Sequence, residues 1–184
     1  EVTVPSSTRT GLMDVLRDIG GAAATDLLGR VIPTAVDASE LVYMSGIVQQ
    51  IDPNAFRPTT ITTARNLLAS PDLNGGDRRQ LLDLLARLGD TEYAAEMAGN
   101  LYDENGRLDG TTLDFLVRTL GEGAMPTIYG AFSDPNAPQQ DKARLMASAM
   151  NFVGSNAQAT EMYNTAFEAV QGNQGLQSMM LLGQ

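Results

Sequence analysis

The feature that most constrains the fold is an apolar pattern that recurs five times along the chain. In each copy an apolar residue is followed by others at +3, +4 and +7, and these positions lie on one face of a helix. The copies begin at Leu12, Met44, Leu81, Leu113 and Met146, so that successive starts are 32, 37, 32 and 33 residues apart. The pattern therefore predicts five amphipathic helices at a nearly constant interval.

Four of the five copies end in a glycine eight residues after their start, namely Gly20, Gly89, Gly121 and Gly154. Glycine adopts the left-handed conformation that commonly ends a helix. Oxygen-bearing side chains that can cap a helix precede other segments, and we predict N-caps at Ser39, Asp77, Thr111 and Ser155.

A second helix is predicted after each closing turn. The same offsets recur from Ala24, Ala94, Met125 and Tyr163, whereas the segment 60–69 that follows the second copy is less regular. Pro33 is expected to end the second helix of the first unit, because proline cannot continue a helix. Pro126 suits the first turn of the helix that it begins. The predicted unit is a helical hairpin.

These observations predict an all-α fold of about five antiparallel helix-hairpin repeats of 31–37 residues. We expect one domain over 1–184, with units near 10–38, 39–76, 77–110, 111–138 and 139–171 and with 172–184 as a tail or the start of a further helix. The period resembles that of α-solenoids, loosely the HEAT-like class, which implies a short right-handed stack. A compact helical bundle is the alternative.

Composition excludes several classes of function. The chain has 12 basic and 22 acidic residues and a net charge of -10, which disfavours nucleic acid and anionic membrane surfaces as partners. No apolar run approaches the length that spans a membrane. Histidine and cysteine are absent, so a Ser-His-Asp triad, a thiol nucleophile and the usual zinc ligands are excluded.

Acidic residues are the remaining candidates for chemistry. Two loops, 72–77 and 103–109, combine aspartate with Asn-Gly, but neither has the ligand spacing of a calcium loop. The stretch 121–123 has two glycines but lacks the Lys-Ser/Thr of a phosphate loop, so we interpret it as a turn. We therefore predict no catalytic, cofactor or metal site.

The leading hypothesis is a non-catalytic protein-interaction or scaffolding module, since stacked hairpins usually recognise proteins or peptides. A basic protein partner fits the acidic charge, and the candidate contacts are Glu92, Glu96, Glu161 and Glu168. One alternative is a carboxylate-dependent enzyme acting with a metal or on a glycan. Another is a helical spacer or docking domain of a larger secreted bacterial effector or toxin.

The two chain termini suggest two further expectations. The chain begins at Glu1 without a leader, which favours a secreted or extracytoplasmic bacterial location over a cytoplasmic one. Near the other end, Leu176, Met179 and Met180 keep the helical offsets in a segment without charge. An apolar helix at the end of a repeat array needs a cover, so packing on a partner or a second copy is one expectation and continuation into a longer protein is another. The alternative is an ordinary closing helix that caps the core of the chain itself.

Overall fold

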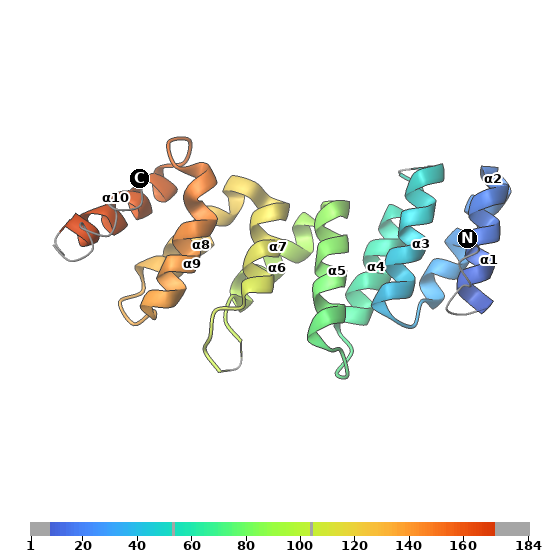
Figure 1. The fold of residues 1–184 in the computed structure, drawn as a ribbon, viewed down its shortest axis with the longest axis horizontal. Helices are drawn as coiled ribbons and strands as arrows, with labels where there is room; N and C mark the ends of the chain where they lie inside the picture. Colours follow the sequence, from blue (N-terminus) through green and yellow to red (C-terminus); the bar gives the residue numbers. More distant parts are fainter. Residues whose placement is uncertain (1–7, 53, 104, 172–184) are drawn as a thin grey trace, which may run out of the picture. The chain divides into compact units, whose positions relative to one another are not determined.

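The computed structural model describes residues 8–52, 54–103 and 105–171, and these residues are helical apart from turns and two isolated β-bridges (Figure 1). The all-α prediction is confirmed. Among the described residues, no helix is long and apolar enough to cross a membrane.

The chain divides into two compact units, one up to Asp90 and the other from Thr91. The first unit contains α1 (Thr8–Ile19), α2 (Gly21–Val31), the 3-10 turn η1 (Ile32–Thr34), α3 (Ala38–Ile51), α4 (Arg57–Leu68) and α5 (Gly75–Leu88). The second contains α6 (Thr91–Met97), η2 (Ala98–Asn100), α7 (Gly110–Leu120), η3 (Gly121–Ala124), α8 (Met125–Ser133), α9 (Gln139–Ala149), η4 (Met150–Phe152) and α10 (Ala157–Gln171). The boundary between the units lies inside the predicted third repeat, 77–110.

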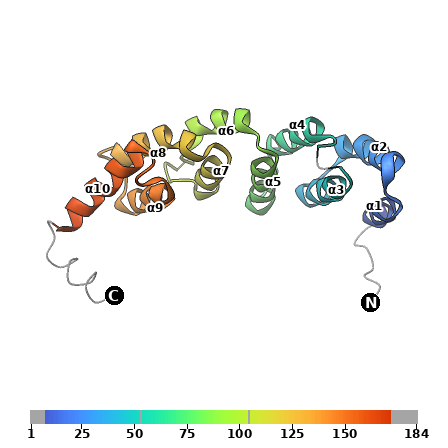
Figure 2. The ribbon, with the colours of Figure 1, turned by 90° about the horizontal axis from the view of Figure 1, so that it is seen from above.

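Alternate helices of the first unit contact one another. Helix α3 packs against both α1 and α5, while α2 packs on α1 and α3, and α4 packs on α3 and α5. Figure 2 shows α1, α3 and α5 on one side of this unit and α2 and α4 on the other. The apolar side chains between these two rows are fully buried, among them Leu28, Ile32, Leu41, Met44, Leu81 and Leu85.

The second unit repeats this alternation. Helix α7 contacts α9, and α8 contacts α10, while α6 packs on α7 and α9 packs on both α8 and α10. Its fully buried side chains include Phe115, Leu116, Met125, Ile128, Leu145 and Met162. Phe115 also meets the ring of Tyr93 on α6, with the two ring centroids 6.1 Å apart.

The apolar pattern correctly locates the buried face in the three middle copies. Met44, Leu81 and Leu113, which begin these copies, are all buried. The first copy is wrong about burial at three of its four positions, because Leu12, Val15 and Ile19 are 56%, 52% and 68% exposed. Its fourth position, Leu16, is buried as predicted, together with Met13. The apolar arc of α1 is wider than the face that α2 and α3 cover.

The last helix also departs from the predicted face. Tyr163 and Phe167 are exposed, and α10 buries Ala159 and Met162 against its neighbours. In the fifth copy Met150 is exposed as well, because α9 ends at Ala149 and gives way to a 3-10 turn. The segment 172–184 lies outside the described residues, so the predicted further helix is not tested.

All four glycines predicted to close a helix have positive φ, and three of them directly follow one, but Gly154 lies beyond η4 and does not close α9, which ends at Ala149. Gly89 is left-handed, with φ 66° and ψ 45°. Gly20 and Gly121 combine positive φ with ψ of -167° and -126°, a region that is essentially open only to glycine. The prolines also behave as expected, since α2 ends two residues before Pro33 and Pro126 lies in the first turn of α8.

The four predicted N-caps are wrong by one to three residues. Asp37 accepts from Glu40 N at the start of α3, Asn74 accepts from Asp77 N at the start of α5, Asp109 accepts from Thr111 N and Thr112 N at the start of α7, and Asn156 accepts from Ala159 N in α10. In each case an Asp or Asn near the predicted residue takes the cap in place of Ser39, Asp77, Thr111 or Ser155. Several residues with capping side chains stand side by side here, and the path of the loop decides which one reaches the free amides.

Candidate functional site

The four glutamates expected to contact a partner all lie in the second unit and are all exposed. Glu92 and Glu96 stand one turn apart on α6, which packs on α7. Glu161 and Glu168 stand two turns apart on α10, which packs on α8 and α9. The four candidate glutamates therefore form two separate pairs, one on α6 and one on α10.

Glu161 has a partner within its own unit. The hydroxyl of Tyr129 on α8 donates to Glu161 Oε1 at 2.7 Å, and this hydrogen bond raises the pKa of Tyr129. The contact ties α10 to α8 at the surface. Glu161 is thus already used in packing, which makes Glu168 the freer acidic group of α10 for an incoming cation.

The two acidic loops are held together by their own carboxylates. Asp103 Oδ1 accepts from Asn105 N and Arg107 N, both at 2.9 Å, and Asp109 caps α7. In the other loop Asn74 caps α5 and donates through Nδ2 to Asp77 at 2.7 Å. Within the described part of the chain, no group of three His, Cys, Asp or Glu residues is placed to hold a metal ion.

The two-glycine stretch 121–123 forms the 3-10 turn η3 between α7 and α8. Its acidic residue, Glu122, accepts a hydrogen bond from Ser155 Oγ at 2.8 Å. The stretch therefore joins two helices and contacts the α9–α10 connection, as a turn between hairpin helices would.

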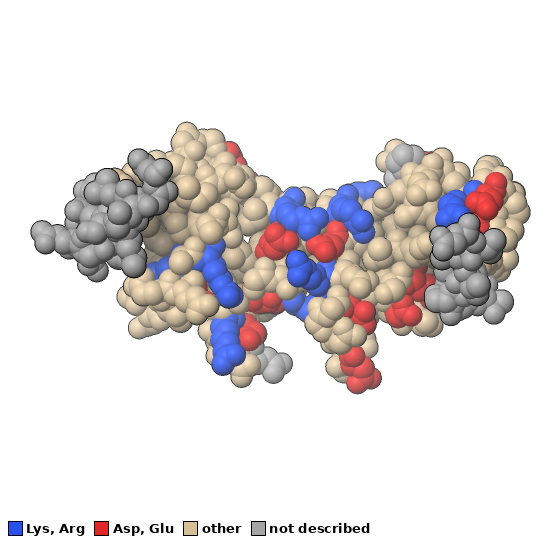
Figure 3. Space-filling view, in the orientation of Figure 1, with Lys and Arg blue, Asp and Glu red and all other residues tan. Residues whose placement is uncertain are grey.

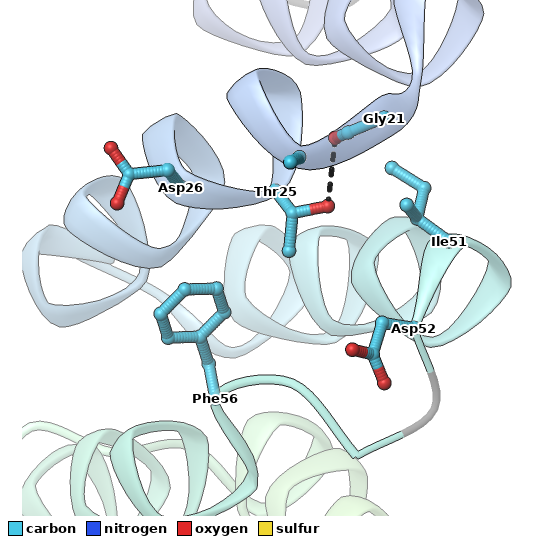
Figure 4. Close-up of a pocket in the computed structure, with 7 residues that line it drawn as sticks. Gly21, Thr25, Asp26, Ile51, Asp52 and Phe56 are labelled. Atoms are coloured by element: carbon cyan, nitrogen blue, oxygen red, sulfur yellow. Dashed lines mark hydrogen bonds between the residues drawn. The ribbon is translucent and has the colours of Figure 1, made fainter.

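A hollow of about 430 Å³ opens in the first unit between the start of α2 and the loop after α3 (Figure 4). Asp26, Asp52 and Phe56 line it, together with Gly21, Ala22, Thr25 and Ile51. The polar groups have local partners: Asp26 pairs with Arg30 at 2.7 Å, Asp52 accepts from Asn54 N at 3.0 Å, and Thr25 Oγ1 donates to Gly21 O at 3.0 Å. These interactions shape the turn, and they leave the hollow without a group committed to a ligand.

A second hollow, of about 420 Å³, lies in the second unit between α7 and α9. Leu113, Val117 and Ala147 give it apolar walls, and Gly110, Asp114, Arg144, Ser148 and Asn151 complete the lining. We call this the α7–α9 groove. Asp114 contributes a negative charge from one helix and Arg144 contributes a positive charge from the other, so the groove offers apolar contact with a charge of each sign.

The α7–α9 groove was not predicted from the sequence. Leu113 and Val117 belong to the predicted apolar face of the fourth copy, which gave no indication that part of this face lines a groove. The available signal was the predicted hairpin arrangement, in which a helix would pack beside the next helix but one and leave a furrow between the two.

Comparisons with known protein families, with curated proteins and with solved structures find no match to this chain. The function must therefore be argued from the geometry described above.

Proposed function

We propose that this chain is a non-catalytic protein-interaction module built from helical-hairpin repeats, in the manner of a short right-handed α-solenoid. The observation that carries the proposal is the contact between alternate helices, α1 to α3 to α5 in one unit and α7 to α9 in the other. Hairpins that stack in this way expose the furrows between equivalent helices, and such furrows are the usual peptide-binding surfaces of repeat proteins.

The α7–α9 groove is the proposed binding surface. Its walls supply apolar area for an anchor side chain, and Asp114 and Arg144 supply charged groups that fix the direction of a bound segment. Asp114 is an accessible acceptor, because its ion pair with Arg118, one turn away, is long at 3.5 Å and both side chains are well exposed. An exposed pair of this kind contributes little, so a ligand cation can replace it at small cost.

The acidic charge of the chain favours a partner that carries arginine or lysine. Glu92, Glu96, Glu161 and Glu168 are exposed in the same unit as the groove and would attract such a partner by long-range electrostatics. We therefore propose a segment with an apolar anchor flanked by basic residues as the ligand.

The test is a selection of peptides from a displayed random library on the folded chain. We expect enriched peptides to combine an apolar residue with Arg or Lys, and to bind less tightly as salt concentration rises. The groove variant is Ala147→Arg, which places a long charged side chain in the groove from an exposed position of α9. We expect it to abolish binding of the enriched peptides.

The matched control is Ala169→Arg, which makes the same chemical change at an exposed position of α10 outside the groove. It should leave affinity nearly unchanged. Equal loss of binding in both variants would place the ligand elsewhere and reject the α7–α9 groove. Failure to enrich any peptide would count against the interaction-module proposal itself.

A further inference from the structure

Glycine directly follows asparagine or aspartate at three places in the chain. In such a pair the backbone nitrogen of the glycine can attack the side-chain carbonyl carbon of the preceding residue, because glycine has no side chain to obstruct the approach. Asparagine is among the chemically labile residues of proteins. The three pairs are Asn74-Gly75, Asn105-Gly106 and Asp109-Gly110. The sequence does not distinguish the two Asn-Gly pairs, whereas the structure does.

Asn74 is held by the helix that it caps. Its Oδ1 accepts a hydrogen bond from Asp77 N at 2.9 Å and its Nδ2 donates to Asp77 Oδ2 at 2.7 Å, so both ends of the amide are bonded. Gly75 is the first residue of α5. Ring closure would need the amide to leave Asp77 and the peptide group at Gly75 to rotate out of the helix start. Loss of a helix cap of this kind disfavours the open conformation by about fivefold.

Asp109 is held in the same way at the start of α7. One carboxylate oxygen accepts from Thr111 N and Thr112 N at 2.9 Å and 3.2 Å, and the other accepts from Thr112 Oγ1 at 2.8 Å. A carboxylate is also a weaker target than an amide, because its negative charge repels a nucleophile that approaches the carbon. The Asp109-Gly110 pair is therefore protected both by the cap and by its charge.

Asn105 has neither form of protection. Its side chain is exposed and makes no hydrogen bond with any described residue. Gly106 lies outside the helices, with φ 69°, and a Cβ at that position would meet nothing within 4 Å. The attacking nitrogen, Gly106 N, donates to Asp103 O at 2.9 Å, and this is an exposed turn bond that water can replace.

The loop that carries Asn105 is exposed at its tip and anchored at its base. It extends beyond the ends of α6 and α7 (Figure 1), and basic and acidic side chains lie exposed at its tip (Figure 3). At the base, Asp109 N donates to Leu101 O at 2.9 Å and Asp103 N donates to Arg107 O at 2.8 Å. The side chain of Leu101 is buried there. These contacts separate position 105 from the core of the unit.

We propose that Asn105 is a site of spontaneous deamidation and isoaspartate formation in the folded protein. Gly106 N forms a bond to Asn105 Cγ and loses its proton, while the side-chain nitrogen takes up a proton and leaves as ammonia. The product is a five-membered cyclic imide. Water then opens this ring. Its addition at the side-chain carbonyl leaves aspartate, and its addition at the main-chain carbonyl leaves isoaspartate, in which the backbone runs through the former side chain.

The products differ from asparagine in charge and, for isoaspartate, in backbone length. Each product adds one negative charge to the net charge of -10. Isoaspartate also inserts a methylene group into the main chain between Asp103 and Arg107, which disrupts the 2.9 Å hydrogen bond from Arg107 N to Asp103 Oδ1. The bonds at the base of the loop do not include Asn105, so the helices should remain intact.

The experiment follows both asparagines in one sample. The folded chain is incubated at mildly alkaline pH, where the attacking nitrogen loses its proton more readily, and is then digested with trypsin and mapped by mass spectrometry. Cleavage after Arg78 and Arg87 places Asn74 and Asn105 in different peptides, and a sample taken before incubation corrects for reaction during digestion. We expect Asn105 to deamidate at least about fivefold faster than Asn74.

The same chain unfolded in urea is the matched control. Neither asparagine then has a cap or a turn, so the two Asn-Gly pairs should react at comparable rates. Equal rates in the folded chain, or a faster reaction at Asn74, overturn the proposal, and so does a folded chain in which Asn105 stays intact while the unfolded chain reacts at both sites. A preference for Asn105 that is equally large in urea would overturn the structural explanation.

Two variants test the cause of the difference. Asn105→Gln would have to close a larger, six-membered ring, so this variant should show no deamidation in the loop and should keep the native far-UV circular dichroism spectrum. Asp77→Ala removes the acceptor of Asn74 Nδ2 and should accelerate deamidation at Asn74 but not at Asn105. An unchanged rate at Asn74 would refute the cap as its protection. No residue of the α7–α9 groove takes part, so these results are independent of the proposed peptide binding.

Discussion

The contact between Gly29 and Phe56 leads to a prediction about stability. Gly29→Ala should lower the free energy of unfolding when Phe56 is present and raise it when Phe56 is replaced by alanine. Phe56 is the one described non-glycine residue with positive φ, 57°, and it precedes α4. Its ring lies against the backbone of α2 at Gly29. A Cβ built on Gly29 would stand 2.2 Å from Phe56 Cε1 and Cζ, far inside van der Waals contact. Gly29→Ala must therefore displace the ring.

Two opposing terms set the magnitude. Alanine stabilises a helix over glycine by about 1 kcal/mol. Against this, forcing atoms into a packed contact costs about 1–3 kcal/mol, and a displaced ring loses part of the roughly 1.5–3 kcal/mol that burying a large apolar side chain contributes. We expect Gly29→Ala to lower the free energy of unfolding by about 1–2 kcal/mol once the helix gain is subtracted.

In a Phe56→Ala background the obstacle is gone, and Gly29→Ala should then stabilise by up to about 1 kcal/mol. The double-mutant cycle should give a coupling energy of about 2–3 kcal/mol, which is large for a single contact. Urea unfolding followed by far-UV circular dichroism measures each corner of the cycle. The two units make it necessary to check that the transition is a single one before free energies are compared.

Gly46→Ala is the matched control, since Gly46 lies in the interior of α3 and a Cβ there would meet nothing within 4 Å. It should stabilise by a similar amount in both backgrounds. If Gly29→Ala behaves like Gly46→Ala in the native background, the ring does not press on α2 and the reasoning is refuted.

Three further predictions test the ion pair of Asp90, the cap at Asp109 and the backbone at Gly121. Asp90 is buried and accepts a hydrogen bond from Arg65 Nε at 2.8 Å. Asp90→Ala removes this acceptor and should lower the free energy of unfolding by about 2–3 kcal/mol, which is less than for a fully buried pair because Arg65 keeps some exposure. A change below about 1 kcal/mol on urea unfolding would contradict this prediction. Asp109→Ala removes the N-cap of α7 and should lower the free energy of unfolding by about 1–2 kcal/mol, whereas Thr111→Ala should lower it by less than about 0.5 kcal/mol. The reverse order would show that Thr111 is the cap, as the sequence predicted. Gly121→Ala should cost about 1–3 kcal/mol through backbone strain alone, because its Cβ would touch nothing within 4 Å, and a thermal shift measures it.

The sequence predicted which segments are helices better than it predicted the residue at which each helix begins. Apolar offsets predicted the helices, and Gly20, Gly89 and Gly121 directly follow helices with positive φ, as predicted, whereas Gly154 lies beyond the end of α9. The caps were misplaced because Asp37, Asn74, Asp109 and Asn156 compete with neighbouring side chains of similar capping strength. Local chemistry narrows a helix start to a few residues, and the tertiary path of the loop selects one of them.

The α7–α9 groove and the Arg65–Asp90 pair were beyond the sequence for a different reason. Arg65 and Asp90 are 25 positions apart, in α4 and just after α5, and no period or motif links them. Asp114 and Arg144 line the same groove only because α7 contacts α9, although the two helices are not consecutive in the chain. Composition and spacing describe one helix at a time, so sites made by two helices need the packing as well.

The exposed residues of α1 show that the sequence of one helix also does not tell which of its apolar residues are buried. Leu12, Val15 and Ile19 satisfy the periodic pattern as well as Met44, Ile47 and Leu84 do, yet only the latter group is covered. Periodicity states that a helix has an apolar face; it does not state whether a neighbouring helix exists to cover it. On α1 the pattern is wider than the arc that α2 and α3 cover, so Leu12, Val15 and Ile19 form an apolar surface that the described helices of this unit leave exposed.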